Sequence, residues 1–263
     1  MIEIKPLDSQ RKKATTIFPP LPFSGYYIAQ KGGGKTTLLL NALYSPEIYK
    51  NKFNRILWFS PTAGFDEKVI DLKKNNPTIE NFPLKREMRK RQGKDAEIMD
   101  AAGSGEEKPS GVEIIEEFTM EIMNELLSSQ KKVINSFNKG LADSICIILD
   151  DMVNSKLLRS KEFTQFLFNS RHYKFSIIII SQSYYSLAKP LRLNMSQVLI
   201  FENGNKAELG RIYEENSLNL SKQEWMRAFK MATSLPFSFL NINYSNVPGK
   251  RLFNCGKHLI VFK

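Results

Sequence analysis

The 263-residue sequence is poor in cysteine and histidine, with two of each. Cys146 and Cys255 are too few for a disulfide framework, and the four residues lie too far apart in sequence for a zinc pattern. Cys146 stands inside an apolar run, where we expect a small core residue. Apolar runs long enough to span a membrane are missing, as is the apolar segment of a signal peptide. These absences exclude a disulfide-stapled domain and predict a protein of the cytosol or a continuous compartment.

Acidic residues are also in short supply. The chain has 38 lysines and arginines against 27 aspartates and glutamates, a formal net charge of +11. Such a chain is attracted to polyanions, and nucleic acid is the first candidate. A basic surface that only aids solubility would give the same balance, and charge does not distinguish DNA from RNA or from an anionic membrane. The 42% of hydrophobic residues suffices for the core of one full α/β domain, or at most two small ones.

Several short segments are continuously apolar, without the polar alternation of a half-exposed strand. This pattern is typical of strands buried on both faces, as in a parallel sheet flanked by helices. We expect such strands at residues 23–29, 55–60, 144–149, 175–180 and 197–201, with added strands at 237–242 and 258–262. We expect helices at residues 35–44, 65–74 and 161–169, and two more between 206 and 231.

Composition divides the chain further. Residues 1–22 are interpreted as an irregular arm, 23–231 as the core, and 232–263 as a β extension of the same domain. Residues 85–111 begin basic and end small and acidic, which predicts an exposed insertion. An apolar stripe at helical spacing follows it, made of Ile115, Phe118, Ile122 and Leu126. The first turns of that expected helix carry Glu113, Glu116 and Glu117.

A glycine-rich loop follows the first expected strand. Residues 29–36, Ala-Gln-Lys-Gly-Gly-Gly-Lys-Thr, fit the Walker A pattern with alanine as the first residue. Glycines let successive backbone N–H groups turn toward phosphate, and the next helix offers its positive N-terminus. Lys35 is expected to reach the β- and γ-phosphates of ATP, and the Thr36 hydroxyl to bind Mg²⁺. The expected nucleotide-binding residues are Ala29, Gln30, Lys31, Gly32, Gly33, Gly34, Lys35, Thr36 and Thr37.

Two carboxylates, Asp150 and Asp151, follow the strand expected at 144–149. The carboxyl ends of parallel strands form the crevice where α/β sheets bind ligands. Asp150 is placed to hold Mg²⁺, and Asp151 to orient and activate the attacking water. Solvated turn residues or a helix cap would look the same in isolation. Together with the glycine loop, the doublet favours hydrolysis of ATP over the chemistry of a nucleotide kinase.

Polar residues also bracket the apolar segment 175–180. Gln182 follows it and is placed to hydrogen-bond the γ-phosphate or the attacking water, although an ordinary loop start is the alternative. Arg171 precedes it. In ring ATPases an arginine from the neighbouring subunit stabilises the transferred phosphoryl group. Arg171 is the first candidate for this finger and Arg192 the second, although most arginines are only solvated surface residues.

Taken together, these segments resemble the FtsK–HerA superfamily of P-loop ATPases, and within it the poxvirus-type genome-packaging ATPases of large DNA viruses and related virophages and elements. The most specific part is Arg-His-Tyr before a buried strand that ends in Gln, followed by Arg-x-Asn. The matching blocks run in the same order over residues 24–213 and comprise 29–37, 56–62, 147–152, 170–185 and 191–201. Residues 85–111 match nothing in this pattern.

The resemblance implies a three-layer α/β, RecA-like fold with a mostly parallel central sheet and an additional strand between the two Walker strands. It also assigns roles to individual residues. Lys35 and Thr36 would bind phosphate and Mg²⁺, and Gln182 would be the sensor. Asp150 and Asp151 would form the Walker B pair, with Arg171 as the finger.

The function implied by the resemblance is an ATP-driven motor. A homo-oligomeric ring at a capsid vertex would hydrolyse ATP to move double-stranded DNA, without regard to its sequence, into a preformed capsid. It would work in the host cytoplasm or viral factory, or in association with the virion. A nucleotide-dependent capsid assembly factor that moves no DNA is the alternative. A nucleotide kinase is a third reading, against which the acidic doublet and Gln182 argue.

Overall fold

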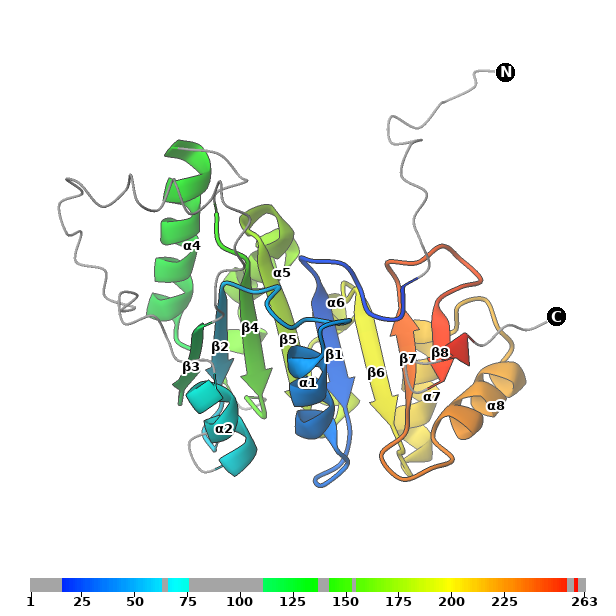
Figure 1. Cartoon of the computed structure of the whole chain (residues 1–263). Helices are drawn as coiled ribbons and strands as arrows, with labels where there is room; N and C mark the ends of the chain where they lie inside the picture. The colour runs from blue at the N-terminus through cyan, green and yellow to red at the C-terminus, as the bar shows by residue number, and fades with distance from the viewer. Residues whose placement is uncertain are drawn as a thin grey trace, which may run out of the picture.

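The computed structural model describes residues 16–62, 66–75, 111–136, 142–152, 155–254 and 258–259. Strands in this part of the chain form one nine-stranded sheet in the order β3-β2-β4-β5-β1-β6-β7-β8-β9 (Figure 1). They are β1 (Ser24–Ile28), β2 (Arg55–Phe59), β3 (Gly111–Ile115), β4 (Ile145–Asp150), β5 (Phe175–Ser181), β6 (Gln197–Phe201), β7 (Phe239–Asn243), β8 (Leu252–Asn254) and β9 (His258–Leu259).

The sheet is parallel from β3 to β6 and antiparallel from β6 to β9. Successive side chains of β4 enter two different cores. Ile147 and Leu149 pack on one face, while Cys146 and Ile148 pack on the other. Both faces are apolar because both are covered, so the strand shows no polar alternation. Cys146 is fully buried, which confirms its expected place in the core.

Helices cover the two faces of the sheet and make three layers. α1 and α2 supply Leu39, Leu43 and Leu72 to one core and lie in front of the sheet in Figure 1. The other core receives residues of α4, α5, α7 and α8. The helices are α1 (Lys35–Tyr44), α2 (Glu67–Asn75), α4 (Met120–Ser136), α5 (Lys161–Asn169), α6 (Lys189–Arg192), α7 (Lys206–Asn216) and α8 (Lys222–Ala232). None of these described helices is long and apolar enough to cross a membrane.

The predicted fold class is confirmed by this arrangement. The sheet is mostly parallel, and β5 lies between β1 and β4, the strands that end in the glycine loop and the acidic doublet. The expected helices at 35–44 and 161–169 have the bounds of α1 and α5, and the expected strand at 197–201 has those of β6.

One expected helix begins later than predicted. The segment that starts the apolar stripe is β3, a parallel edge strand beside β2, and α4 begins only at Met120. Glu113 therefore lies in a strand, where it forms a 2.7 Å ion pair with Arg55 of β2. The Thr119 hydroxyl accepts a hydrogen bond from Ile122 N and caps α4. Pairing along the sheet edge outweighs the helical spacing of this apolar stripe, and Glu116 and Glu117 lie in the turn between the two elements.

The sheet continues past β6 through the last part of the chain. β7 matches the expected strand at 237–242, whereas the three-residue β8 is too short to stand out as a pattern and was missed. Of the expected arm, residues 16–22 form neither helix nor strand and are tied to β7, where Asn241 and Asn243 donate to the Ile17 carbonyl. Residues 1–15 of the arm and 85–110 of the expected insertion lie outside the described residues.

Candidate active site

The glycine loop joins β1 to α1 and has the backbone that its sequence predicts. Gly32 and Gly34 have φ angles of 77° and 91°, which side chains rarely allow. A Cβ on Gly33 would lie 2.8 Å from Cβ of Ala29, so the loop folds too tightly for any side chain there. Gly34 begins α1 without a side-chain cap. The helix N-terminus is therefore open to an anion.

Lys35 is nearly buried, with 7% of its surface exposed. Its ammonium donates hydrogen bonds to the carbonyls of Ala29 and Gln30, within its own loop. Burial lowers the pKa of Lys35, and the nearby charges of Asp151 and Asp150 oppose that effect. The loop carbonyls thus hold the Lys35 ammonium within the glycine loop, near the carboxylates of Asp150 and Asp151.

Thr36 and Asp150 provide a hydroxyl and a carboxylate, the kind of oxygen ligands that a Mg²⁺ site needs from the protein. Within the described part of the chain the Thr36 hydroxyl makes no hydrogen bond, whereas the neighbouring Thr37 hydroxyl accepts one from Lys68 at 3.0 Å. The described residues contain no group of three or more His, Cys, Asp or Glu side chains that could hold a metal ion by themselves. Mg²⁺ needs only one or two protein oxygens when phosphates and water supply the rest. The donor set therefore fits Mg²⁺ bound together with a nucleotide.

Asp150 is the last residue of β4 and is largely buried. Burial, and next the charge of Asp151, raise its pKa from 3.8 to about 6, while Lys35 and the indole of Trp58 pull it down. Trp58 Nε1 is buried and has no acceptor at hydrogen-bond distance among the described residues, so the indole lies near the Asp150 carboxylate without forming a full hydrogen bond. An ionised Asp150 is thus costly by itself, which favours a cation beside it.

Asp150→Asn should stabilise the nucleotide-free protein, and the gain should depend on pH. Because the folded pKa lies above the unfolded one, ionised Asp150 destabilises the fold at pH above 6. That penalty disappears as the pH falls below 4. We expect a gain of about 2 to 3 kcal/mol at pH 8 that vanishes near pH 4, measured by urea unfolding without Mg²⁺. Asp143→Asn, before the other end of β4, is the control. A gain that is equal at both pH values would contradict this account.

Asp151 and Gln182 meet across the ends of β4 and β5. The Gln182 amide donates a 2.9 Å hydrogen bond to Asp151 Oδ2, and both side chains are exposed. Asp151 has a φ of 52°, a left-handed conformation that aspartate tolerates better than most residues. Its N–H donates to the Ile180 carbonyl at 3.2 Å. The structure thus brings the second acid and the expected sensor into direct contact, at the edge of the sheet that holds the glycine loop.

Arg171 lies at the opposite end of the parallel strands, where the strands begin. It belongs to the short helix η4 (Ser170–Tyr173), which precedes β5. Its exposed guanidinium donates a hydrogen bond to Ser196 Oγ, next to the start of β6. Because parallel strands start at one edge and end at the other, Arg171 is far from the glycine loop of its own subunit.

A family model described as "Poxvirus A32 protein" matches residues 109–241, half of the chain. The chain belongs to the poxvirus A32 protein family. The matched region holds β3 to β6 and the first part of β7, with Asp150, Asp151, Gln182 and Arg171, while the glycine loop precedes it. The resemblance to poxvirus-type ATPases of the FtsK–HerA superfamily is confirmed. No curated protein matches the sequence.

Solved structures show the same fold as this family member. B204, described as the DNA-packaging ATPase from Sulfolobus turreted icosahedral virus, is 15% identical, with a TM-score of 0.55 over 86% of this chain and 94% of its own. The genome packaging NTPase B204 from Sulfolobus turreted icosahedral virus 2, in complex with ATP-γS, is 13% identical. Its TM-score is 0.54 over 92% of this chain and 97% of its own.

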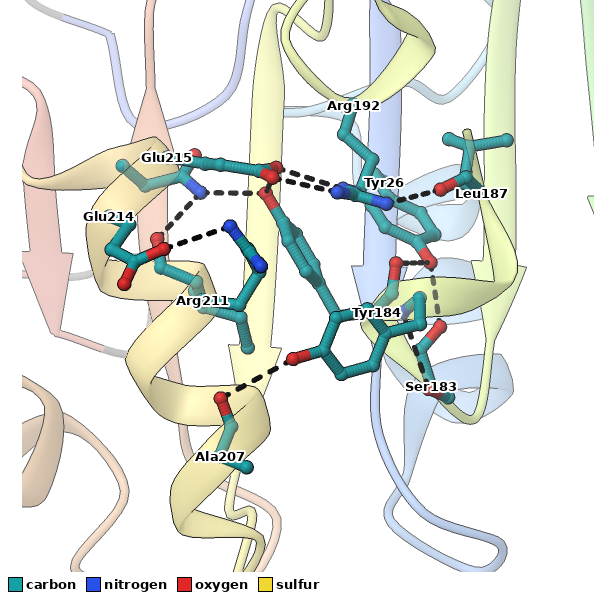
Figure 2. Close-up of polar contacts among 12 residues, drawn as sticks. Tyr26, Ser183, Tyr184, Leu187, Arg192, Ala207, Arg211, Glu214 and Glu215 are labelled. Carbon is teal, nitrogen blue, oxygen red and sulfur yellow. Dashed lines mark hydrogen bonds and ion pairs between the residues drawn. The ribbon is translucent and has the colours of Figure 1, made fainter. Parts of the chain in front are cut away.

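A buried polar network supports the sensor loop that follows β5. The Tyr26 hydroxyl donates to the carbonyls of Ser183 and Tyr184 at 2.7 and 3.0 Å, as Figure 2 shows. Glu208 of α7 accepts from Ser183 Oγ and Tyr184 N, both at 2.6 Å. Burial raises the pKa of Tyr26, so it stays a donor. Gln182 is therefore followed directly by two residues that β1 and α7 hold in place.

Arg192, the second candidate for the finger, is part of this network and is not free to act on another subunit. Its guanidinium forms two hydrogen bonds with Glu215 at 2.7 and 2.8 Å, donates to the Leu187 carbonyl, and stacks 4.6 Å from the centre of the Tyr184 ring (Figure 2). Only 7% of the Arg192 side chain and 5% of that of Glu215 are exposed. The tertiary structure turns this arginine inward, which favours Arg171 over Arg192 as the candidate finger.

Arg192→Ala should cost about 3 to 5 kcal/mol of folding stability, because it leaves Glu215 buried without its partner. The melting temperature should fall by about 10 °C for a protein of this size. Arg211→Ala is the matched control: this arginine pairs with Glu214 on the surface, with 46% and 62% exposed, and should cost less than 1 kcal/mol. Equal losses for the two variants would show that the buried pair has no special weight.

Glu208 and Glu215 were not singled out from the sequence. Both lie on α7, in a segment whose charged residues look like the solvated face of a helix. Glu208 is nevertheless 5% exposed and also accepts from Asn203 Nδ2. The only local signal is the Asn205 cap, whose side chain accepts from the N–H groups of Ala207 and Glu208. That signal places the start of the helix but not its buried acids.

Proposed function

We propose that this chain is the ATPase subunit of a viral motor that uses ATP to drive double-stranded DNA into a preformed capsid. The observation that carries the proposal is the gathering of Lys35, Asp150, Asp151 and Gln182 at the carboxyl ends of three adjacent strands, with Gln182 bonded to Asp151. Membership of the poxvirus A32 family and the fold of the packaging NTPase B204 support it.

Each side chain of the site has one task in hydrolysis. Lys35 exchanges the loop carbonyls for the β- and γ-phosphate oxygens of ATP. Thr36 and Asp150 hold Mg²⁺, which when bound neutralises charge on those oxygens. Asp151 orients the attacking water and accepts its proton. Gln182 fixes the Asp151 carboxylate through their hydrogen bond and reports the state of the γ-phosphate to the loop that Glu208 holds.

The reaction also requires a neighbouring subunit. Arg171 is exposed at the edge of the sheet away from its own glycine loop, so it supplies the finger to the next site in a homo-oligomeric ring. The ring sits at a capsid vertex, in the host cytoplasm or viral factory or on the virion. Lysine and arginine side chains hold DNA phosphates rather than bases, because a motor must ignore sequence. The net charge of +11 suits that contact.

ATP hydrolysis with and without long double-stranded DNA tests this function. We expect wild-type protein to hydrolyse ATP, DNA of any sequence to accelerate hydrolysis, and the acceleration to weaken as salt rises. Lys35→Ala should be inactive, whereas Lys50→Ala, an exposed lysine beyond α1, should behave as wild type. Hydrolysis that is indifferent to DNA would favour a nucleotide-dependent capsid assembly factor. Phosphoryl transfer to a small acceptor would establish a kinase instead.

A further inference from the structure

The loop from α8 to β7 lies beside the glycine loop. A Cβ built on Gly34 would lie 3.1 Å from Cδ1 and 3.5 Å from Cβ of Phe237, so this phenylalanine packs against the last glycine before Lys35. β7 starts opposite the end of β6, where Phe239 pairs with Phe201. Both loops therefore lie at the same edge of the sheet, the lower end in Figure 1.

This loop also carries the two most exposed large apolar side chains in the described part of the chain. Leu235 and Phe237 are each 70% exposed, more than any other large apolar residue there. An aromatic ring that touches the glycine loop on one side and water on the other has an uncovered face. A site for a flat, apolar ligand group needs such a face.

Phe237 is held in this position by a strained turn. Its φ is 60°, in the left-handed region that a bulky residue rarely adopts. The buried Ser238 closes the turn, because its Oγ accepts from Leu235 N at 3.1 Å and its N–H donates to the Leu235 carbonyl at 3.1 Å. The turn keeps the ring out of the core and beside the glycine loop. Strain of this kind gathers at ligand sites.

The order of the strands sets the direction in which a nucleotide lies. Asp151 and Gln182 stand at the ends of β4 and β5, on one side of β1, so the γ-phosphate lies on that side. β6 and β7 lie on the other side of β1. A triphosphate that crosses the glycine loop from the γ-phosphate therefore leaves its nucleoside over β6 and β7, where Phe237 is exposed.

We infer that Phe237 forms the base-binding site of the nucleotide, with its ring stacked on the adenine of ATP and Leu235 as a flanking apolar contact. This inference rests on the proposed function, because it requires a nucleotide in the glycine loop. Stacking needs only the flat face of a base, so Phe237 contributes to the binding of ATP and GTP alike.

Equilibrium binding of ADP and of inorganic tripolyphosphate separates a base contact from a phosphate contact. Phe237→Ala should weaken ADP binding about tenfold, the size of a single base–aromatic stack, and leave tripolyphosphate within twofold of wild type. Phe237→Trp should restore ADP binding, and its fluorescence should respond to ADP but not to tripolyphosphate. Phe168→Ala, which removes an exposed phenylalanine of α5, is the matched control and should bind both ligands as wild type.

Three results would overturn the inference. Equal weakening of both ligands would mean that Phe237 acts only through the shape of the glycine loop. Unchanged ADP affinity would mean that the exposed ring is covered by something other than the base, such as a neighbouring subunit. If the wild-type protein bound neither ligand, the proposed function itself would fail and the base site with it. Tripolyphosphate binding by the wild-type protein does not need the base site, so its absence identifies this last case.

Discussion

Asp151→Asn should reduce ATP hydrolysis by about 10²- to 10⁴-fold while nucleotide affinity stays within a few-fold of wild type. The substitution replaces one carboxylate oxygen with an amide and removes the group that takes the proton from water. Asparagine adopts the left-handed conformation of position 151, where φ is 52°, as readily as aspartate does. The fold should therefore be intact, and the loss should lie in kcat rather than in KM.

The size of this effect depends on the partner that Asp151 meets. Gln182 donates to Asp151 Oδ2 at 2.9 Å, so Gln182→Ala should also slow hydrolysis, but less, because it frees the carboxylate without removing it. Single-turnover hydrolysis and ADP binding measure the two quantities separately. Asp143→Asn is the control, since Asp143 precedes the far end of the same strand. If Asp151→Asn retained more than a tenth of wild-type activity, the base would have to be another group.

Arg171→Ala should lower the hydrolysis rate of the assembled ring by about 10³-fold or more, the range found for arginine fingers that act in trans. Arg171 is exposed, and Ser196 is the only hydrogen-bond partner of its guanidinium among the described residues, so removing it should leave folding stability nearly unchanged. That behaviour is the opposite of the one expected for Arg192→Ala, which should lose stability. Thermal unfolding and hydrolysis, measured on both variants, therefore distinguish the two arginines.

Mixing tests whether Arg171 acts across a subunit boundary. A mixture of Arg171→Ala subunits with Lys35→Ala subunits should recover part of the activity. In a mixed ring, the intact glycine loop of an Arg171→Ala subunit can lie beside the intact Arg171 of a Lys35→Ala subunit. Either variant alone should remain inactive. Arg211→Ala, an exposed arginine on α7, should behave as wild type in the same mixture. Absence of any recovery, with mixed rings verified, would argue that Arg171 serves its own subunit or only the fold.

Most of the parallel sheet and the residues at its carboxyl edge follow from local patterns. Ile177–Ile180 of β5, for example, are apolar at four successive positions, which is typical of a strand covered on both faces, and the two acids and Gln182 lie at the ends of such strands. The strands at or near the two sides of the sheet could not be predicted as well. β3 shares its apolar spacing with a helix, and β8 has only three residues. At an edge, pairing with one neighbour decides the structure, and that neighbour is distant in the sequence.

The sequence by itself determined the glycine loop, the doublet of Asp150 and Asp151 and the position of Gln182. Each of these depends on residues that are adjacent in the chain, through backbone freedom or the end of a buried strand. Only the tertiary structure decided that Arg192 turns inward to Glu215 and that Phe237 lies against Gly34. These contacts join elements that are far apart in the chain, and the order and packing of the strands bring them together. The order of the strands cannot be predicted from the composition of each segment alone.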